Sequence, residues 1–445
     1  MSVSPARAAA FEILLRVDRE HSYASELLHS TRLSKLSPSD HGLATELVMG
    51  VLRWRSVLDE RLAIASAQRL ERLDVEVLTA LRLGVYQLQF LSRVPARAAI
   101  FESVEMVKAA RKRSAASFVN AVLRKAAATE RQDIVLEIQN AINAKTLAAS
   151  SAHLDWLVSR WVEHYGLATA RQICLHNQTV PTTAIRVHDD LADDEFVQAG
   201  VEVSPGLLLA GARRVRAGDV TRTRAYREGR ISIQDEASQL VALLVERGER
   251  ILDCCAAPGG KTFLLAKRNP QARVFASDLH RHRARLLRDL ARLPNVYAIA
   301  ADARQLPFAG GFDRVLADVP CSGTGTLARN PEIKWRLTPK DLFELQSRQV
   351  AILKSALAQL GPGGRLVYST CSLEREENED VVQAVLAEAE GFQVIHCRPE
   401  LEQLRRSGEL TWNDFSSLLL GPYLRTLPGI HPCDGFFAAV VERQT

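Results

Sequence analysis

Apolar residues recur at steps of three and four through roughly the first quarter of the chain. Residues at these steps share one face of a helix, so the pattern predicts amphipathic helices that bury a common stripe. No segment here alternates apolar and polar positions convincingly, as a strand would. The expected helices are 8–17, 41–55, 73–90, 100–110 and 114–125. The pattern therefore predicts an all-α bundle, which we assign to residues 1–130.

The pattern changes after residue 234, where short apolar, strand-like runs alternate with helical stretches. Alternation at this spacing predicts βαβ units, and hence an α/β fold class with a doubly wound, mostly parallel, Rossmann-like sheet. The expected strands, in chain order, are 250–254, 273–277, one that ends at Asp302, 312–317 and 365–370, and the expected helices are 261–267, 281–293 and 341–360. Ligands of such sheets bind at the carboxyl ends of the strands. We assign this domain to residues 231–445.

The region between these two patterns is mixed. An alanine-rich stretch at 129–150 suits a connecting helix or linker, and a strand is expected at 182–187. We therefore assign residues 131–230 to a connecting segment and a substrate-side subdomain.

Composition and charge narrow the class of protein. A chain of 445 residues is too long for one ordinary core, and 47% hydrophobic with 24% charged residues is typical of a soluble globular protein. The net charge of +5 permits a nucleic-acid partner without requiring one. No stretch predicts a membrane span, and the first residues do not resemble a signal peptide. We expect a cytoplasmic protein with no membrane partner.

Basic residues gather in two places, Lys108 with 111–113, and seven arginines between 213 and 230. Such clusters are either solvated faces or phosphate contacts, and the sequence leaves both interpretations open. The seven cysteines are odd in number, widely spaced and without a C-x-x-C pair. This pattern excludes a disulfide framework and predicts no metal site, so the thiols are either packed or nucleophilic.

A glycine turn follows the first expected strand of the α/β region. Glycines at a strand–helix turn let the backbone approach a ligand closely, and a carboxylate about 20 residues further on can hold a ribose diol. Asp278 stands at that distance, and Asp302 ends the third strand, where an adenine amino group would be held. The expected cofactor residues are Cys255, Ala256, Ala257, Pro258, Gly259, Gly260, Lys261, Asp278, Asp302 and Asp318.

The spacing of the glycines in this turn distinguishes three classes of cofactor. Dinucleotide-binding turns need G-x-G-x-x-G and P-loops need G-x-x-x-x-G-K-[ST], and neither pattern is present. A nucleoside cofactor without a pyrophosphate fits best, which indicates S-adenosylmethionine.

Two cysteines follow the fourth and fifth strands, Cys321 after Asp318-Val-Pro and Cys371 after Ser-Thr. The sheet should place both thiols and Asp318 beside the cofactor methyl group. Cytosine C5 is too weak a nucleophile to take a methyl group directly, but thiolate addition at C6 makes an enamine that can. A carboxyl such as Asp318 would assist this addition at N3. The chemistry needs one attacking thiol, and the residues by themselves offer two.

These motifs resemble the RNA cytosine-C5 methyltransferase family, and the match spans about residues 230 to 445. The quoted segments are Cys-Ala-Ala-Pro-Gly-Gly-Lys, Asp-Val-Pro-Cys-Ser-Gly and Ser-Thr-Cys-Ser. The resemblance implies that Cys371 is the nucleophile and that Cys321 serves product release. Cytosine-C5 DNA methyltransferases instead attack with the Pro-Cys thiol, which is the rival assignment for Cys321.

Further segments extend the resemblance. Residues 234–238 and 434–437 resemble the family's lead-in and closing strand, and 330–335 resembles its basic loop. This loop implies that Lys334 lies near the target nucleotide. Asn330 departs from the family's usual histidine, so it is left out of the site.

The helical part resembles the NusB-type RNA-binding domain at residues 46–55 and 118–124. That domain ahead of this catalytic domain is characteristic of the branch that methylates 16S ribosomal RNA, which implies a cytosine in a single strand or loop as substrate. The alternatives are a bundle that only stabilises the enzyme, a tRNA cytosine-C5 methyltransferase, and a non-catalytic RNA-binding assembly factor. We expect a monomer.

Overall fold

The computed structural model describes residues 3–20, 22–30, 33–129, 133–189, 192–291 and 293–444. Contacts divide the chain into two compact units. The helical unit contains residues 1–180 and 327–336, and the sheet unit contains 181–326 and 337–445. The division into 1–130, 131–230 and 231–445 stays a prediction, since the observed units follow packing and not the changes of sequence pattern.

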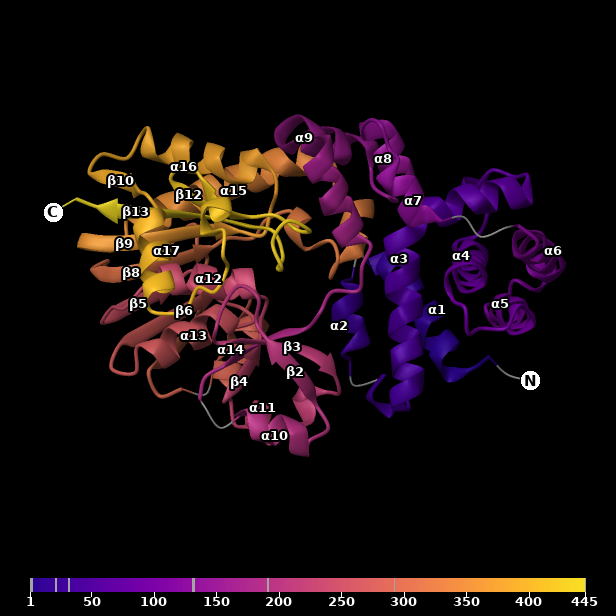
Figure 1. The fold of residues 1–445 in the computed structure, drawn as a ribbon, viewed down its shortest axis with the longest axis horizontal. Coiled ribbons are helices and arrows are strands. Elements are labelled where there is room, and N and C mark those ends of the chain that lie inside the picture. The colour runs from indigo at the N-terminus through magenta and orange to yellow at the C-terminus, as the bar shows by residue number, and fades with distance from the viewer. Residues whose placement is uncertain are drawn as a thin grey trace. The chain divides into compact units, whose positions relative to one another are not determined.

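The helical unit is built from antiparallel and crossing helices (Figure 1). Its helices are α1 (Pro5–Glu20), α2 (Ala24–Leu28), α3 (Pro38–Ser66), α4 (Val75–Phe90), α5 (Ala96–Ala109), α6 (Ala116–Ala127), α7 (Ile134–Gln139), α8 (Ala144–Ser150) and α9 (Asp155–Asn177). All five expected helices are present, with ends shifted by a few residues or, in α3, extended by about three turns. The sequence pattern did not predict α9, in which Gly166 adopts a φ of +78° and interrupts the helix.

Local residues explain where the longest helix begins and how closely it packs. The Ser37 side chain accepts a hydrogen bond from the backbone N–H of Asp40, and Pro38 occupies the first turn of α3. Gly50 then lies against α4, where a Cβ would come within 2.0 Å of the Tyr86 ring. Glycine is thus required for the close approach of α3 and α4.

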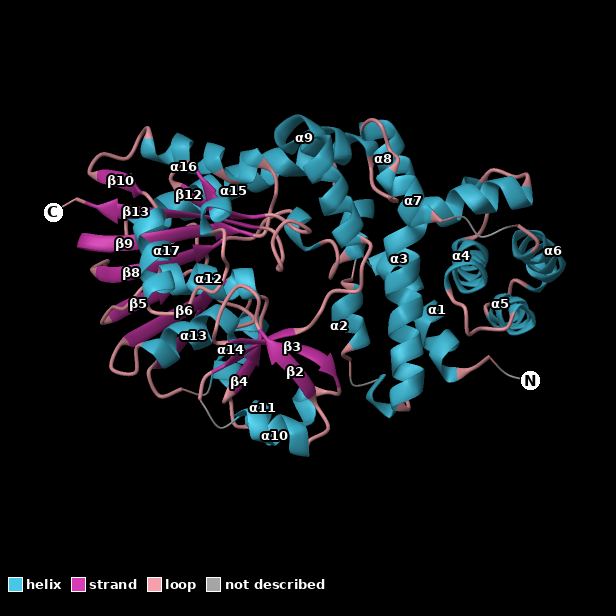
Figure 2. Ribbon diagram, in the orientation of Figure 1, coloured by secondary structure: helices cyan, strands magenta, loops and turns pink. Residues whose placement is uncertain are grey.

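The sheet unit contains two sheets with helices on both sides of the larger one (Figure 2). The large sheet has the strand order β11-β12-β13-β9-β8-β5-β6-β7, with β10 paired to β13. Strands β9, β8, β5, β6 and β7 are parallel, and β10 to β13 pair antiparallel. The small sheet, β2-β3-β1-β4, is antiparallel.

The strands are β1 (Ala184–Val187), β2 (Glu202–Pro205), β3 (Ala212–Ala217), β4 (Ile231–Ile233), β5 (Arg250–Asp253), β6 (Arg273–Asp278), β7 (Val296–Ala300), β8 (Phe312–Asp318), β9 (Leu360–Thr370), β10 (Phe392–Ile395), β11 (Leu419–Leu420), β12 (Tyr423–Thr426) and β13 (Phe436–Arg443). The helices are α10 (Ala192–Gln198), α11 (Arg224–Arg227), α12 (Glu236–Leu244), α13 (Gly260–Arg268), α14 (Arg281–Ala291), α15 (Pro339–Leu357), α16 (Glu379–Leu386) and α17 (Arg398–Arg406).

The large sheet is buried on both faces, which explains its continuous apolar strands. In β9, Leu366 and Tyr368 belong to the core shared with α15 and α16, whereas Val367 belongs to the core shared with α12, α13 and α17. Successive strand side chains point to opposite faces, so both faces must be apolar when helices cover both. The predicted doubly wound α/β arrangement is confirmed. Within the described ranges, no helix is both long and apolar enough to cross a membrane.

Candidate active site

The two thiols meet because β8 and β9 are neighbours in the sheet. Their parallel register pairs Asp318 with Ser369, so the loops that follow both strands leave the same sheet edge. The backbone N–H of Val319 donates to the Ser369 carbonyl at 2.9 Å. Beyond this point Cys321 Sγ and Cys371 Sγ lie 3.3 Å apart, and both residues are half-buried. The predicted pairing of the two cysteines is present.

A glycine fixes one loop directly to the other. The backbone N–H of Gly325 donates to the Cys371 carbonyl at 2.9 Å. A Cβ at this position would lie 2.8 Å from the same carbonyl oxygen and 2.2 Å from the Gly435 oxygen. Only glycine allows this approach, so the conformation of the Cys371 loop depends on Gly325.

The environment distinguishes the two thiols. The hydrogen bond with Cys371, burial, and the nearby Cys371 and Glu377 raise the pKa of the Cys321 thiol well above its usual range. Cys321 therefore keeps its proton, which it can donate to the Cys371 sulfur.

The carboxylate of Asp318 lies at the end of β8, between the thiols and the glycine turn. Lys261 Nζ donates to Asp318 Oδ2 at 2.7 Å, and Ser369 Oγ donates to Oδ1 at 2.7 Å. The Asp318 side chain remains 26% exposed, which leaves it accessible to a ligand. Lys261 and Ser369 thus orient the carboxylate without covering it.

A pocket lies between the end of β5 and the start of α13. The turn is possible because Gly259 adopts a φ of +115° directly before α13. The predicted residues that line the pocket are Cys255, Ala256, Ala257, Pro258, Gly260, Lys261 and Asp318. The structure therefore brings most of the predicted cofactor residues together around one cavity, and places Gly259 in the turn itself.

Asp278 and Asp302 are not in the lining of this pocket. Asp278 ends β6, and its Oδ1 accepts a hydrogen bond from the His280 backbone N–H at 2.9 Å. Asp302 follows β7 and forms an ion pair with Arg304 at 2.7 Å, whose hydrogen bonds lower the pKa of Asp302. Both carboxylates lie at or beyond strand ends of the same sheet edge, and their cofactor contacts stay a prediction.

Four pocket residues were not among the predicted cofactor residues, namely Ile233, Gln234, Ser238 and Asp253. Asp253 is the last residue of β5, and the start of the Cys-Cys-Ala-Ala-Pro motif could have indicated it. Burial raises the pKa of Asp253 to about 7, although Thr262 Oγ1 donates to its Oδ2 at 2.7 Å. Its Oδ1 is buried and has no hydrogen-bond partner among the described residues, as expected beside a cavity that takes a polar ligand.

Lys334 is not grouped with these residues. It belongs to the helical unit, is fully buried, and donates from Nζ to the Arg53 and Ala152 carbonyls, each at 2.8 Å. Burial lowers the pKa of its ammonium well below the usual range. The expectation that Lys334 contacts the target nucleotide therefore stays a prediction, while its observed contacts stabilise the helical unit.

The basic clusters are partly neutralised by carboxylates. Lys108 pairs with Glu105 and Lys112 with Asp74, and in the second cluster Arg213 pairs with Asp193. Arg222, Arg224 and Arg230 also form ion pairs with nearby acids. These pairs favour the solvated-face interpretation for much of the second cluster.

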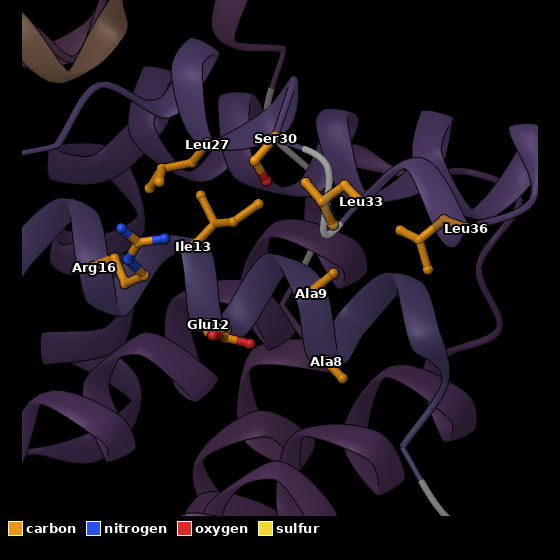
Figure 3. Close-up of a pocket in the computed structure, with 9 residues that line it drawn as sticks. All are labelled: Ala8, Ala9, Glu12, Ile13, Arg16, Leu27, Ser30, Leu33 and Leu36. Atoms are coloured by element: carbon orange, nitrogen blue, oxygen red, sulfur yellow. The ribbon is translucent and has the colours of Figure 1, made fainter. Parts of the chain in front are cut away.

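A second cavity lies in the helical unit, between α1 and the residues Leu27, Ser30, Leu33 and Leu36 (Figure 3). Apolar side chains dominate it, including Ile13, Leu27, Leu33 and Leu36, with Glu12 and Arg16 at its margin. None of the predicted site residues lines it. Across the described ranges, no three or more His, Cys, Asp or Glu side chains are arranged to hold a metal ion.

Comparisons with known proteins identify relatives for both the N-terminal helices and the C-terminal α/β part of the chain. The model of the family described as 16S rRNA methyltransferase RsmB/F matches residues 240–442, and that of the NusB family matches residues 4–128. The chain is 33% identical over 459 residues to the probable ribosomal RNA small subunit methyltransferase B of Bacillus subtilis (strain 168), with 100% of each chain covered. It is 32% identical over 451 residues to the ribosomal RNA small subunit methyltransferase B of Vibrio cholerae, with 98% of this chain and 97% of that chain covered.

Solved structures are similar in fold. The crystal structure of PH0851 covers 100% of both chains with a TM-score of 0.81 and 22% identity. The crystal structure of NSun6 from Pyrococcus horikoshii with SFG covers 64% of this chain and 97% of that one, with a TM-score of 0.54 and 19% identity. At these identities the likeness concerns the fold alone.

Proposed function

Because the chain belongs to the 16S rRNA methyltransferase RsmB/F family, we propose that it methylates C5 of a cytosine in 16S ribosomal RNA through a covalent bond between Cys371 and C6 of the base. Membership rests on full-length identity of 33% to a curated relative, and it makes the chain a methyltransferase of small-subunit ribosomal RNA. It also confirms the NusB-like helical part and S-adenosylmethionine as the cofactor. The base, the atom and the covalent step are the proposal.

The observation that carries the proposal is the 3.3 Å approach of the two thiols in the loops that follow β8 and β9, where Asp318, the last residue of β8, lines the cofactor pocket. Direct methylation of a nitrogen or hydroxyl would need no thiol at all. A C5 carbon needs a nucleophile at C6 and a proton acceptor at C5, and a thiol pair supplies both.

The residues have separate tasks in the proposed reaction. The Cys371 thiol gives its proton to the Asp318 carboxylate, and the thiolate forms a bond to C6. The displaced electron pair is received at N3, to which Asp318 passes that proton, and Asp318 takes the proton back when the Cys371–C6 bond breaks. Lys261 and Ser369 hold the Asp318 carboxyl in place for that transfer. S-adenosylmethionine, when bound, supplies the methyl group that C5 takes.

Cys321 completes the cycle. In the free enzyme its hydrogen bond with Cys371 is the largest cause of its raised pKa. Once Cys371 Sγ is bonded to C6, that hydrogen bond is lost and the pKa of Cys321 falls. Cys321 then gives up its proton to solvent. Its thiolate accepts the C5 proton while the Cys371–C6 bond breaks and the Cys371 thiolate leaves, which is the product-release role predicted for Cys321.

The pocket residues fit the cofactor. Asp253 Oδ1 offers an unused acceptor, and Gly259, whose φ of +115° favours glycine, forms the turn that borders the pocket. The Asp318 carboxylate at the rim suits a cationic sulfonium. Asp278 would hold the ribose diol and Asp302 the adenine amino group.

The test combines two cysteine variants with 16S rRNA and the cofactor. Cys371→Ser should abolish methyl transfer while cofactor binding stays nearly intact. Cys321→Ala should accumulate an RNA–protein adduct that survives denaturing electrophoresis, because addition proceeds and release does not. The double variant is the control and should form no adduct. Full activity in Cys371→Ser, or an adduct in the double variant, refutes the assignment.

Bisulfite sequencing of RNA from cells that lack the protein identifies the substrate. Loss of one protected cytosine in 16S rRNA supports the proposal. Loss in tRNA alone indicates a tRNA cytosine-C5 methyltransferase. Unchanged protection in every RNA, with an inactive purified protein, indicates an RNA-binding assembly factor that keeps the methyltransferase fold.

A further inference from the structure

A buried carboxylate lies behind the two thiols and belongs to none of the motifs discussed above. Glu377 is fully buried at the end of the short helical turn Arg375–Glu377. Its side chain accepts hydrogen bonds from Ser322 and Ser372, the residues that directly follow the two site cysteines. One side chain therefore connects the Cys321 loop to the Cys371 loop.

The bonds use both carboxylate oxygens. Oε1 accepts from the Ser322 backbone N–H at 2.8 Å and from Gln349 Nε2 at 2.9 Å. Oε2 accepts from the hydroxyls of Ser322 and Ser372, whose oxygens lie 3.1 Å from each other. Gln349 also donates to the Pro320 carbonyl at 2.9 Å, which connects α15 to the residue before Cys321. The Glu377 carboxylate thus joins three chain segments that are distant in sequence.

Backbone contacts fix Glu377 itself. The Tyr368 hydroxyl donates to the Glu377 carbonyl at 2.6 Å, and Tyr368 is a fully buried residue of β9. The adjacent Asn378 accepts from Thr370 Oγ1 and donates to the Ser372 carbonyl at 3.0 Å. The carboxylate therefore occupies a defined position relative to the strand that carries Cys371.

This carboxylate is bonded by neutral donors. The four donors to its oxygens are a backbone N–H, an amide and two hydroxyls, and no cation of the described chain forms a recorded ion pair with it. A buried carboxyl group loses its hydration, and these four hydrogen bonds replace it.

We infer that Glu377 is a positioning residue of the methyl-transfer site, whose carboxylate sets the spacing of the Cys321 and Cys371 thiols by holding both loops at once. This inference rests on the proposed function for its consequence in catalysis, but its geometry does not involve RNA or cofactor. Glu377 touches neither thiol group through a recorded hydrogen bond, so it acts through Ser322 and Ser372.

The charge adds a second effect. The titratable groups that act on the Cys321 thiol are Cys371 and Glu377, and both raise the pKa of Cys321. Glu377 thereby helps Cys321 keep its proton until Cys371 is bonded to the base. Spacing and charge can be separated by two conservative substitutions at the same position.

Glu377→Asp keeps the charge but shortens the side chain by about 1.5 Å, the length of one carbon–carbon bond. It should no longer reach Ser322 and Ser372 together, so the thiols should separate. Glu377→Gln keeps the length and removes the charge, so the spacing should be largely retained while the pKa of Cys321 falls. Glu344→Gln is the matched control, because Glu344 is an exposed residue of α15 paired with Lys340.

The spacing is measured without RNA or cofactor, in the full-length protein. Diamide oxidises two adjacent thiols to a disulfide, and the two thiol hydrogens reduce the diazene to a hydrazine. Mass spectrometry of the Cys321–Cys371 peptide pair gives the rate. We expect a disulfide rate at least about tenfold lower in Glu377→Asp than in the wild type, and an unchanged rate in Glu344→Gln.

The charge is measured by alkylation of Cys321 with iodoacetamide as a function of pH, in a Cys371→Ser background that leaves one site thiol. Glu377→Gln should shift the profile to lower pH, and Glu377→Asp should shift it little. If Glu377 only stabilised the fold, Glu377→Asp and Glu377→Gln would have the same effect on the disulfide rate and on the pH profile of Cys321 alkylation. Equal disulfide rates in Glu377→Asp and the wild type overturn the inference.

The catalytic consequence is measured last. A displacement of about 1 Å at a reacting group costs roughly 100-fold in rate, so Glu377→Asp should lower single-turnover methylation by about that factor while cofactor affinity changes less than threefold. If Cys371→Ser remains active, the proposed function fails, yet the disulfide rates still decide the role of Glu377. If the disulfide rates are equal, the inference on Glu377 fails although the proposed function stands.

Discussion

Asp253 is expected to make the sheet unit less stable as the pH rises. Its side chain is a fully buried carboxyl at the end of β5, and burial raises its pKa from 3.8 to about 7. The folded state therefore binds a proton that the unfolded state releases above pH 3.8. Stability from this group is fully present below pH 3.8 and is lost as pH rises toward and through 7.

The magnitude follows from these two pKa values. Linkage gives a penalty of about 2 kcal/mol at pH 5 and about 4 kcal/mol at pH 8 for keeping Asp253 buried. Asp253→Asn cannot ionise and escapes this penalty, while its amide oxygen can still accept from Thr262. The stability gained by Asp253→Asn over the wild type should thus grow by between 2 and 3 kcal/mol, roughly 100-fold in an opening equilibrium, from pH 5 to pH 8.

Hydrogen exchange of peptides from β5 and β9 measures this difference at the same pH for both proteins, so the intrinsic exchange rates cancel. The ratio of wild-type to variant exchange should rise roughly 100-fold between pH 5 and pH 8. Asp380→Asn, at a surface carboxylate paired with Arg375, is the control and should show no such rise. A constant ratio for Asp253→Asn would mean that Asp253 is ionised in the folded protein at both pH values, contrary to the reasoning above.

Three further substitutions test the two units. Lys334→Ala should destabilise the helical unit by about 3 kcal/mol or more, because it empties a buried site and removes the Nζ donor from two carbonyls, and thermal unfolding measures this. A loss of methylation at unchanged stability would instead place Lys334 at the nucleotide. Gly325→Ala should displace the Cys371 loop and abolish activity, whereas Gly361→Ala, whose Cβ would have its nearest neighbour at 3.5 Å, should be tolerated; equal activity of the two variants would contradict the packing. Asp278→Asn should raise the cofactor Kd by about 10- to 100-fold in calorimetry, since it removes a charged acceptor for the ribose diol, and an unchanged Kd would place the ribose elsewhere.

Local sequence patterns were sufficient to predict much of the fold. Helical stripes and buried strands depend on residues a few positions apart, so the five N-terminal helices and the parallel strands were predictable from spacing. The glycine turn and the strand-end residues Asp318, Cys321 and Cys371 were predictable for the same reason, since parallel strands deliver their carboxyl ends to one edge. The broken helix α9 and the antiparallel strands β10 to β12 were missed, because the first is interrupted at Gly166 and the latter pair only through long-range contacts. The strand β13 was anticipated only through the resemblance of residues 434–437 to a closing strand.

Tertiary structure decided the features that depend on pairs of residues far apart in the chain. The sequence by itself placed two thiols at neighbouring strand ends, and only the register of β8 and β9 sets their sulfurs 3.3 Å apart. Glu377 carries no sequence signal, because its role lies in bonds to Ser322, which is 55 residues away. Lys334 stands in a catalytic-domain motif but is buried in the helical unit. The pattern of residue types determines which side chains share a face of a helix or an edge of a sheet. The distance between two atoms, the burial of a side chain and its electrostatic environment depend on every residue packed around it.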